Sequence, residues 1–325
     1  MSTVEVAVDD RGVADVVISN EPINLMTTAM FRDLATTVSA LAADDAVRAV
    51  VFRSADPEWF IAHFDVEAIL GFPTEIPDEP VPNGFHAMCE TLRTMSKPTI
   101  ARIEGRVGGG GSEFALGCDM RFATPSSVFC QPEVALGIIP GGSGTVRLPR
   151  LIGRSRALEV VLGCDDVDAR TAEAWGWVNR VLPDDEIAGF VDRLAGRIAS
   201  FPAHAVAEAK ASVVSADLGV EDHLLAESAA FTRTLGHDES RRAMRSFLER
   251  GGQTPEGERR LGELAGGLSG RSPGVPDGDL DAGPADGAPG GSAADSPRGP
   301  DGGSAGARGG DLDDVPAGDA AAEPS

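Results

Sequence analysis

The strongest constraint on the fold is an alternation of two hydrophobic patterns between residue 4 and about residue 182. Short apolar runs of strand length are separated by segments whose apolar residues recur every three or four positions, as on an amphipathic helix. Residues 30–42 show the helical pattern most clearly, because Phe31, Leu34 and Val38 share one face. Strands that alternate with helices predict an α/β fold with parallel strands. The expected strands are residues 13–18, 47–52, 97–103, 120–123 and 127–130, and the other expected helices are residues 85–95 and 111–118.

A second region, residues 183–250, shows only helical patterns. It offers little apolar surface for a core of its own, so we expect it to pack on the first region or on another subunit. The expected helices are residues 184–199, 204–214, 223–231 and 240–250.

The last region, residues 251–325, is dominated by Gly, Pro, Ala, Asp and Ser and contains no aromatic residue. Such a composition cannot bury enough apolar surface to offset an ordering entropy of ~1–2 kcal/mol per residue. We therefore expect a disordered acidic tail that keeps the protein in solution, with a partner-binding segment as the alternative.

Charge and cysteine content disfavour several kinds of function. The chain carries 51 Asp and Glu against 28 Lys and Arg, which disfavours a nucleic-acid partner. The four cysteines form no close pair of the kind that binds zinc, so no metal site is expected. Free thiols fit a reducing cytoplasm. Because we find neither a signal segment nor a run of the ~20 apolar residues that span a membrane, we expect a cytoplasmic protein without a membrane partner.

Four consecutive glycines, Gly108 to Gly111, stand between an expected strand and an expected helix. Glycines at such a place let backbone N–H groups approach a ligand, and a helix N-terminus adds a partial positive charge. The run could therefore hold a carbonyl oxygen that gains negative charge. Tight helix packing is an equally good explanation of the glycines alone. The usual phosphate-binding patterns are missing.

Two further stretches contain candidate functional residues. Residues 60–66 follow an apolar run and contain a histidine and an aspartate, and residues 129–145 contain Gln-Pro-Glu and a glycine-rich loop. Together with residues 103–119, in this order and spacing, they resemble the enoyl-CoA hydratase/isomerase (crotonase) family over roughly residues 4–250. The resemblance implies an α/β, crotonase-like spiral of ββα units in residues 1–182 and a helical oligomerisation subdomain in residues 183–250.

The resemblance also implies a substrate and a state of assembly. It implies that the protein binds an acyl-CoA thioester and forms a homotrimer or a hexamer. No separate cofactor is implied, because coenzyme A is part of the substrate.

By motif position, the resemblance assigns the backbone N–H groups of Phe64 and Gly110 to the thioester oxygen. Loss of one such donor typically costs about 10²–10³ in rate. It assigns Glu133 as the base that deprotonates water, and Glu113 as the residue that orients the water and delivers a proton to Cα. Water would then add across the 2,3 double bond of an enoyl-CoA. The expected substrate-binding residues are Ala62, where the family holds the CoA adenine, with His63, Asp65, Gly109 and Gly141.

One residue departs from the family pattern, because His63 stands where the family usually has Gly. Its ring could serve as a further acid or base, since the unperturbed pKa of His is ~6.5, or it could be a packing substitution that reshapes the loop. Two other functions stay open. One is a different reaction on the same fold, namely double-bond isomerisation, decarboxylation or thioester hydrolysis. The other is a non-catalytic scaffold that binds acyl-CoA.

Overall fold

The computed structural model describes residues 3–75, 82–217 and 219–269, so most of the predicted tail lies outside the described residues. Within these ranges no helix is long and apolar enough to cross a membrane. The strands are β1 (Thr3–Val8), β2 (Val13–Ser19), β3 (Ala49–Ser54), β4 (Trp59–Ile61), β5 (Thr99–Ile103), β6 (Arg106–Gly108), β7 (Met120–Ala123), β8 (Val128–Cys130), β9 (Val167–Asp168) and β10 (Arg180–Val181). The helices are α1 (Thr28–Ala43), α2 (Val66–Ile69), α3 (Gly84–Thr94), α4 (Gly109–Gly117), α5 (Gly144–Ile152), α6 (Arg154–Gly163), α7 (Ala169–Trp175), α8 (Asp184–Ala199), α9 (Ala203–Ser215), α10 (Val220–Leu235), α11 (Asp238–Glu249), α12 (Pro255–Glu258) and α13 (Leu261–Gly266), with 3-10 turns η1 (Glu133–Leu136) and η2 (Gly267–Ser269).

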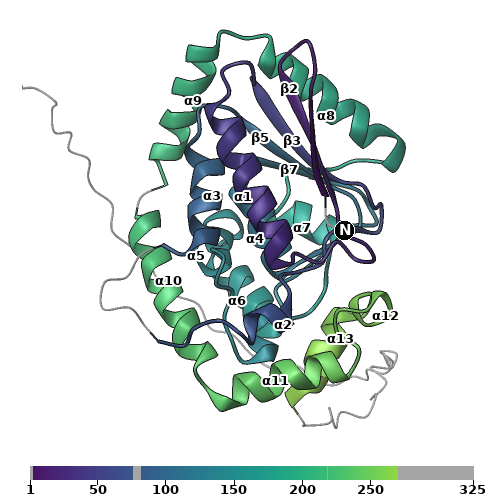
Figure 1. Ribbon diagram of the computed structural model, residues 1–325. Helices are drawn as coiled ribbons and strands as arrows, with labels where there is room; N and C mark the ends of the chain where they lie inside the picture. Colours follow the sequence, from purple (N-terminus) through teal and green to yellow (C-terminus); the bar gives the residue numbers. More distant parts are fainter. Residues whose placement is uncertain (1–2, 76–81, 218, 270–325) are drawn as a thin grey trace, which may run out of the picture. The chain divides into compact units, whose positions relative to one another are not determined.

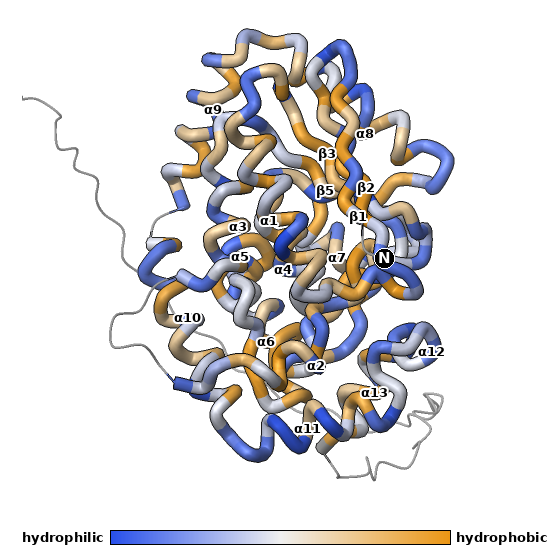
Figure 2. The backbone as a smooth tube through the Cα atoms, viewed as in Figure 1, coloured by the Kyte–Doolittle hydropathy of each residue, from blue (hydrophilic) through white to orange (hydrophobic). Residues whose placement is uncertain are grey.

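The larger of two sheets has six strands in the order β1-β2-β3-β5-β7-β10. Only β1 and β2 pair antiparallel; the other neighbours are parallel, as the alternation of strands and helices predicts. Successive side chains of β3 point to opposite faces, so Val50 and Phe52 pack with α1 while Ala49 and Val51 pack with α8. The sheet therefore lies between α1 and α3 on one face and α8 on the other (Figure 1). Figure 2 shows its central strands as strongly apolar.

The smaller sheet, in the order β4-β6-β8-β9, carries the predicted site. β4 pairs parallel with β6, and β6 pairs parallel with β8. Each of these three strands is followed within a few residues by one predicted site residue, namely Phe64, Gly110 and Glu133. Because the carboxyl ends of parallel neighbours share one edge of a sheet, the three sequence stretches meet there. The predicted α/β fold with a helical C-terminal part is confirmed.

Helix α4 begins two residues earlier than the sequence pattern indicates. Gly109 and Gly110 form its first turn, so three of the four glycines are helical and only Gly108 precedes the helix. Gly109 has a φ of +44°, a value that a residue with a Cβ adopts only with strain. The glycine run is therefore the start of the helix and not a loop before it.

The helical region packs mainly on the first region, which is one of its two expected placements. Ile187, Val191 and Ala195 of α8 lie buried against the larger sheet. α10 and α11 continue around the site, where Phe231 and Phe247 contact the same apolar cluster. α9 differs, because none of its residues is buried although it consists largely of Ala and Val (Figure 2).

The predicted start of the tail at residue 251 is wrong, because residues 251–269 contain short helical elements. Residues 251–269 form α12, α13 and η2, which lie near α2 and α11 at the lower end of Figure 1. Leu261 and Ala265 are buried, four residues apart on one face of α13, and Thr254 caps α12. Leu261 joins an existing cluster that contains Leu136 and Phe247, so the segment needs no core of its own.

Candidate active site

A cavity of about 460 Å³ opens beside the N-terminus of α4. Both predicted glutamates, Glu113 and Glu133, line it, as do the predicted donors Phe64 and Gly110. Most of the remaining wall is apolar. It includes six phenylalanines, Phe31, Phe64, Phe72, Phe85, Phe231 and Phe247. The cavity therefore combines two carboxyl groups with a surface suited to an apolar group.

The backbone N–H groups of Phe64 and Gly110 lie close together in the wall of this cavity. A Cβ added to Gly110 would lie 3.3 Å from the Phe64 nitrogen, so the two peptide groups are neighbours. Gly110 is the second residue of α4 and has no intrahelical acceptor for its N–H. Within the described ranges, neither N–H donates to another residue. Two unpaired donors and a helix N-terminus can stabilise an oxygen that gains negative charge.

Glu113 lies in the middle of α4 and is buried. Its Oε1 accepts hydrogen bonds from the N–H groups of Gly142 at 2.8 Å and Gly144 at 2.7 Å. Burial, together with the nearby Glu133 and Glu227, raises the pKa of Glu113 well above its ordinary value, and the two N–H bonds oppose this only in part. Glu113 therefore keeps its proton to a higher pH than an ordinary glutamate does, and its Oε2 is not bound by these two N–H groups.

Glu133 is the first residue of η1, directly after the Gln-Pro pair that ends β8. Its Oε2 is buried and has no hydrogen-bond partner among the described residues. Burial raises its pKa to about 7, while the charge of His63 acts in the opposite direction. A carboxylate with this pKa and a free oxygen is suited to accept a proton near neutral pH. The two glutamates thus have raised pKa values in different surroundings, because two N–H groups bind Glu113 whereas Glu133 Oε2 has no partner among the described residues. Such a difference in surroundings can separate the pKa values of two carboxyl groups and suits them to paired acid and base roles.

His63 lies next to these groups and is almost fully buried. Its Nδ1 is 2.8 Å from the Phe64 carbonyl oxygen, and its Nε2 is 2.9 Å from Glu258 Oε1. Burial lowers its pKa, but the Glu258 carboxylate outweighs burial and the result is a pKa of about 8. With both ring nitrogens engaged, His63 has no free nitrogen for proton exchange with a bound molecule. This arrangement favours neither the acid/base hypothesis nor simple packing.

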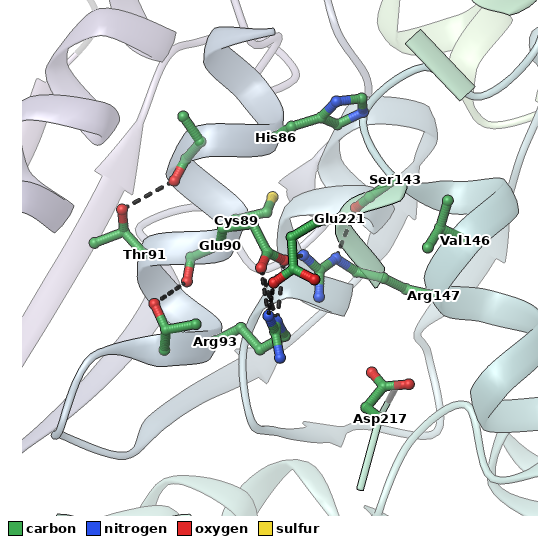
Figure 3. A network of polar contacts seen from close by, with 12 residues as sticks. His86, Cys89, Glu90, Thr91, Arg93, Ser143, Val146, Arg147, Asp217 and Glu221 are labelled. Carbon is green, nitrogen blue, oxygen red and sulfur yellow. Dashed lines mark hydrogen bonds and ion pairs between the residues drawn. The ribbon is translucent and has the colours of Figure 1, made fainter. Parts of the chain in front are cut away.

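Behind the cavity, an ion-pair network fixes the start of α5. Arg147 donates to the Ser143 hydroxyl at 2.9 Å and pairs with Glu90 of α3. Glu90 in turn pairs with Arg93 at 2.5 Å (Figure 3). The segment whose N–H groups bind Glu113 is therefore connected to α3 through Arg147 and Glu90.

Comparison with known proteins connects this geometry to a family. The sequence profile of the family described as enoyl-CoA hydratase/isomerase matches residues 9–256. The chain belongs to this family. It is 31% identical over 245 residues to a protein of Dictyostelium discoideum named probable enoyl-CoA hydratase, mitochondrial, a match that covers 74% of this chain and 87% of the relative. It is 29% identical over 248 residues to the short-chain-enoyl-CoA hydratase of Clostridium acetobutylicum, covering 75% of this chain and 95% of the relative.

A solved structure supports the same assignment. The crystal structure of a candidate enoyl-CoA hydratase from Streptomyces avermitilis has a TM-score of 0.75 and 38% sequence identity to this chain. The match covers 83% of this chain and 99% of that structure. The likeness therefore extends over most of the chain and includes the three stretches that form the cavity.

Not all residues predicted from the enoyl-CoA hydratase/isomerase pattern reach the cavity. Ala62 is buried beside Trp59 and does not line it. Asp65 also lies outside the cavity wall and caps α2 by accepting from the Glu67 N–H at 3.0 Å. Gly109 lies behind the wall, where an added Cβ would come within 2.9 Å of Glu133 Oε1. The remaining predicted residues, Phe64, Gly110, Glu113, Glu133, His63 and Gly141, do line the cavity.

Two buried carboxylates near the site were not predicted from the sequence. Glu258 contacts His63, and Glu227 of α10 accepts from the Ser143 and Thr145 N–H groups at 2.7 and 2.9 Å. Both are ordinary glutamates of acidic helices in the sequence, with no motif around them. Only their contacts in the folded protein distinguish them from other glutamates.

Proposed function

We propose that the protein is an enoyl-CoA hydratase, which reversibly adds water across the 2,3 double bond of an enoyl-CoA thioester. The observation that carries this proposal is that Glu113 and Glu133 line one cavity and that Glu133 Oε2 has no hydrogen-bond partner among the described residues. The raised pKa of Glu113 fits the role of an acid beside it. The unpaired N–H groups of Phe64 and Gly110 lie in the same cavity. The names of the two relatives from Dictyostelium and Clostridium support the same reaction.

The proposed chemistry assigns one role to each group. The N–H groups of Phe64 and Gly110 hold the thioester oxygen, which draws electrons away from Cβ. Glu133 removes a proton from water as the water oxygen forms its bond to Cβ. The electron pair of the double bond moves to Cα and the thioester, and the enolate oxygen is held by the two donors. Glu113 then supplies a proton to Cα, and the reverse sequence gives dehydration.

The wall of the cavity fits an apolar acyl group. The six phenylalanines named above line the cavity together with further apolar side chains, among them Val66, Ile69, Leu136 and Ile138. An apolar acyl chain can be buried against these side chains, whereas a charged group placed against them would lose its hydration. The reaction needs no separate cofactor, because coenzyme A arrives as part of the substrate.

The test is incubation of the purified protein with crotonyl-CoA and with longer 2-enoyl-CoAs, following the loss of enoyl absorbance and identifying the 3-hydroxyacyl-CoA by mass. Hydration that is lost in the Glu113→Gln/Glu133→Gln double variant supports the proposal. Absence of hydration with every chain length would refute it. Release of free CoA or CO₂ instead would favour thioester hydrolysis or decarboxylation, and binding without turnover would favour a scaffold role.

We also propose that the protein assembles as a homotrimer or as a hexamer made of two trimers. Exposed apolar side chains support an interface, notably Leu158 and Leu162 of α6, which are 48% and 62% exposed, and Val213 of α9, which is 76% exposed. Single surface leucines are common, but an Ala- and Val-rich helix without a buried residue is less so. Light scattering of the full chain should give three or six times the monomer mass; a monomer would refute this.

A further inference from the structure

The hydrogen-bond partners of His63 determine its charge. Its Nδ1 faces the Phe64 carbonyl oxygen, which can only accept, so Nδ1 carries a hydrogen. Its Nε2 faces Glu258 Oε1, and that oxygen also accepts from the Gln253 N–H at 2.6 Å. An oxygen that accepts two hydrogen bonds fits a carboxylate, so Nε2 carries a hydrogen as well. His63 is therefore an imidazolium paired with a carboxylate.

Glu258 belongs to the C-terminal segment, residues 251–269, and only 1% of its surface is exposed. The same segment makes two more bonds to the loop around His63. Gln253 Oε1 accepts from the Val66 N–H at 2.8 Å, and Gln253 Nε2 donates to Asp65 Oδ1 at 3.0 Å. Three hydrogen bonds thus connect residues 251–269 to His63, Asp65 and Val66, on either side of Phe64. These three residues belong to the loop that presents the Phe64 N–H.

The other bonds of this loop leave one donor unused. The His63 carbonyl accepts from the Met26 N–H at 2.9 Å, and the Asp65 N–H donates to the Met26 carbonyl at 3.0 Å. The Phe64 carbonyl is held by the His63 ring. Both peptide groups that flank Phe64 are therefore fixed, and its N–H alone is left to face the cavity.

Glu133 is the second group that His63 affects. A Cβ placed on Gly109 would lie 3.1 Å from His63 Cβ and 2.9 Å from Glu133 Oε1, so the two side chains flank the same glycine. The charge of His63 lowers the pKa of Glu133 against the effect of burial. The charged groups that face His63 are Glu258 from α12 and Glu133 from η1, and α11 contributes only the Phe247 ring at 5.8 Å.

We propose that His63 and Glu258 are positioning residues for the hydration reaction: their buried ion pair fixes the Phe64 N–H toward the thioester oxygen and places a positive charge beside Glu133. The proposal rests on the proposed function. Neither residue exchanges a proton with the substrate. The role assigned to them is to hold the donor in place and to keep Glu133 in its basic form at neutral pH.

The first test measures the pH dependence of kcat/KM for the full-length Glu258→Gln variant. Loss of the carboxylate makes the neutral form of His63 favourable, so the pKa of Glu133 rises. We expect the acid limb of the profile to move up by about one pH unit, which makes activity near pH 6.5 about tenfold lower, with kcat falling more than KM changes. The matched control is Glu256→Gln on the exposed side of the same helix, which should leave the profile unchanged.

A second variant, in which neither member of the ion pair is charged, should fold even if the single variant does not. His63→Gln/Glu258→Gln removes both charges and leaves two amides that can bond to one another, so it avoids an unpaired buried ion. The same upward shift of the acid limb is expected. A folded double variant with the wild-type acid limb and the wild-type kcat would overturn the proposal, because a purely structural role predicts that result.

The second test does not depend on turnover. The ring of His63, assigned by comparison with the double variant, should be doubly protonated at pH 7 by NMR and should titrate near 8. In Glu258→Gln its midpoint should fall below 6.5. A ring that is neutral at pH 7 in the wild-type protein overturns the ion pair. An imidazolium at pH 7 in a protein that hydrates no enoyl-CoA would instead refute the proposed function and the role built on it, while leaving the ion pair intact.

Discussion

Glu113 and Glu227 accept alternate N–H groups of one loop, residues 142–145. Glu113 comes from α4 at the centre of the fold, and Glu227 comes from α10 at its periphery. The loop is thus held between two buried carboxyl groups, and the position of one depends on the other. The four bonds in chain order are Gly142 to Glu113 at 2.8 Å, Ser143 to Glu227 at 2.7 Å, Gly144 to Glu113 at 2.7 Å and Thr145 to Glu227 at 2.9 Å.

This relationship predicts that Glu227→Gln damages the site although Glu227 does not line the cavity. An amide offers one acceptor oxygen where the carboxylate offers two, so one loop N–H would face an NH₂ group. We expect a loss of about 1–3 kcal/mol in the free energy of unfolding. We also expect kcat to fall about tenfold or more, because Glu113 shifts with the loop. Thermal denaturation and steady-state hydration kinetics measure the two effects.

The control for this variant is Glu221→Gln on the same helix. Its side chain is 71% exposed, and its pairing with Arg93 at 3.3 Å should contribute little. Both its melting temperature and its kcat should match the wild type. Equal behaviour of the Glu227 and Glu221 variants would show that the alternating bonds are not needed to position Glu113.

The two glutamates proposed as acid and base should each lose activity when replaced by glutamine. In Glu113→Gln the amide oxygen can still accept the Gly142 and Gly144 N–H groups, so the melting temperature should hardly change. Its kcat should fall by about 10²–10⁴, because the amide cannot deliver a proton to Cα. Glu133→Gln should lose activity to a similar extent through loss of the base. A Glu113→Gln protein with wild-type turnover would remove Glu113 from the proposed chemistry.

The pKa of Glu133 sets the pH dependence of the reaction. Because burial raises it to about 7, the basic form is lost as the pH falls through 7. The value of kcat/KM should therefore decrease about tenfold for each pH unit below that point. An ordinary glutamate would place this limb near pH 4.5. A profile that stays flat between pH 7 and pH 5.5 would contradict a raised pKa of Glu133 during the reaction.

Gly110 permits a direct test of the two backbone donors. A methyl group at this position would come within 3.1 Å of Phe64 Cβ and 3.3 Å of the Phe64 nitrogen, in the space that a bound oxygen needs. Gly110→Ala should thus reduce kcat/KM by about 10²–10³. Gly163→Ala is the control, because an added Cβ meets nothing within 4 Å there, and it should retain activity with slightly higher stability. Similar kinetics for the two alanine variants would contradict the assignment of the oxyanion site.

The part of this site that could be predicted from sequence is the part encoded by short local patterns. Glu113 and Glu133 belong to stretches whose glycines and prolines repeat the pattern of the family, so their places were available without a structure. The start of α4 was placed two residues late because consecutive glycines usually indicate a loop. In the folded protein, the Gly109 φ of +44° lets the helix begin within the run.

Contacts between segments far apart in the sequence could not be predicted from the sequence, for a physical reason. Glu258 meets His63 across 195 residues of sequence, and nothing near residue 258 distinguishes it from other surface acids. The composition of residues 251–269 argues correctly that this segment has no core of its own. It is held because Leu261, with Leu264 and Leu268, adds to a cluster that contains residues of α11 and η1. Burial of that kind depends on the partner surface, which local composition does not report.

The ion pair between His63 and Glu258 should also appear in the pH dependence of stability. The pKa of His63 is raised from its ordinary value to about 8, so its contribution is fully present below pH 6.5 and is lost as the pH rises through 8. The pKa of Glu258 is lowered, so its contribution is present above its ordinary value of 4.5 and is lost in acid. The pair therefore contributes most between about pH 4.5 and pH 6.5.

The measurement is the difference in melting temperature between the wild type and His63→Gln/Glu258→Gln from pH 5 to pH 9. Other titrating groups that His63 and Glu258 do not touch are present in both proteins and largely cancel in the difference. The effect of His63 on Glu133 belongs to the contribution of the His63 charge and disappears when the ring loses its proton. We expect the advantage of the wild type to be greatest near pH 6 and to shrink steadily above pH 7.5. The sign follows from the folded state binding more protons than the unfolded chain around pH 7. A difference that is constant up to pH 9 would mean that His63 carries no extra proton in the folded protein, and the charge beside Glu133 would be absent.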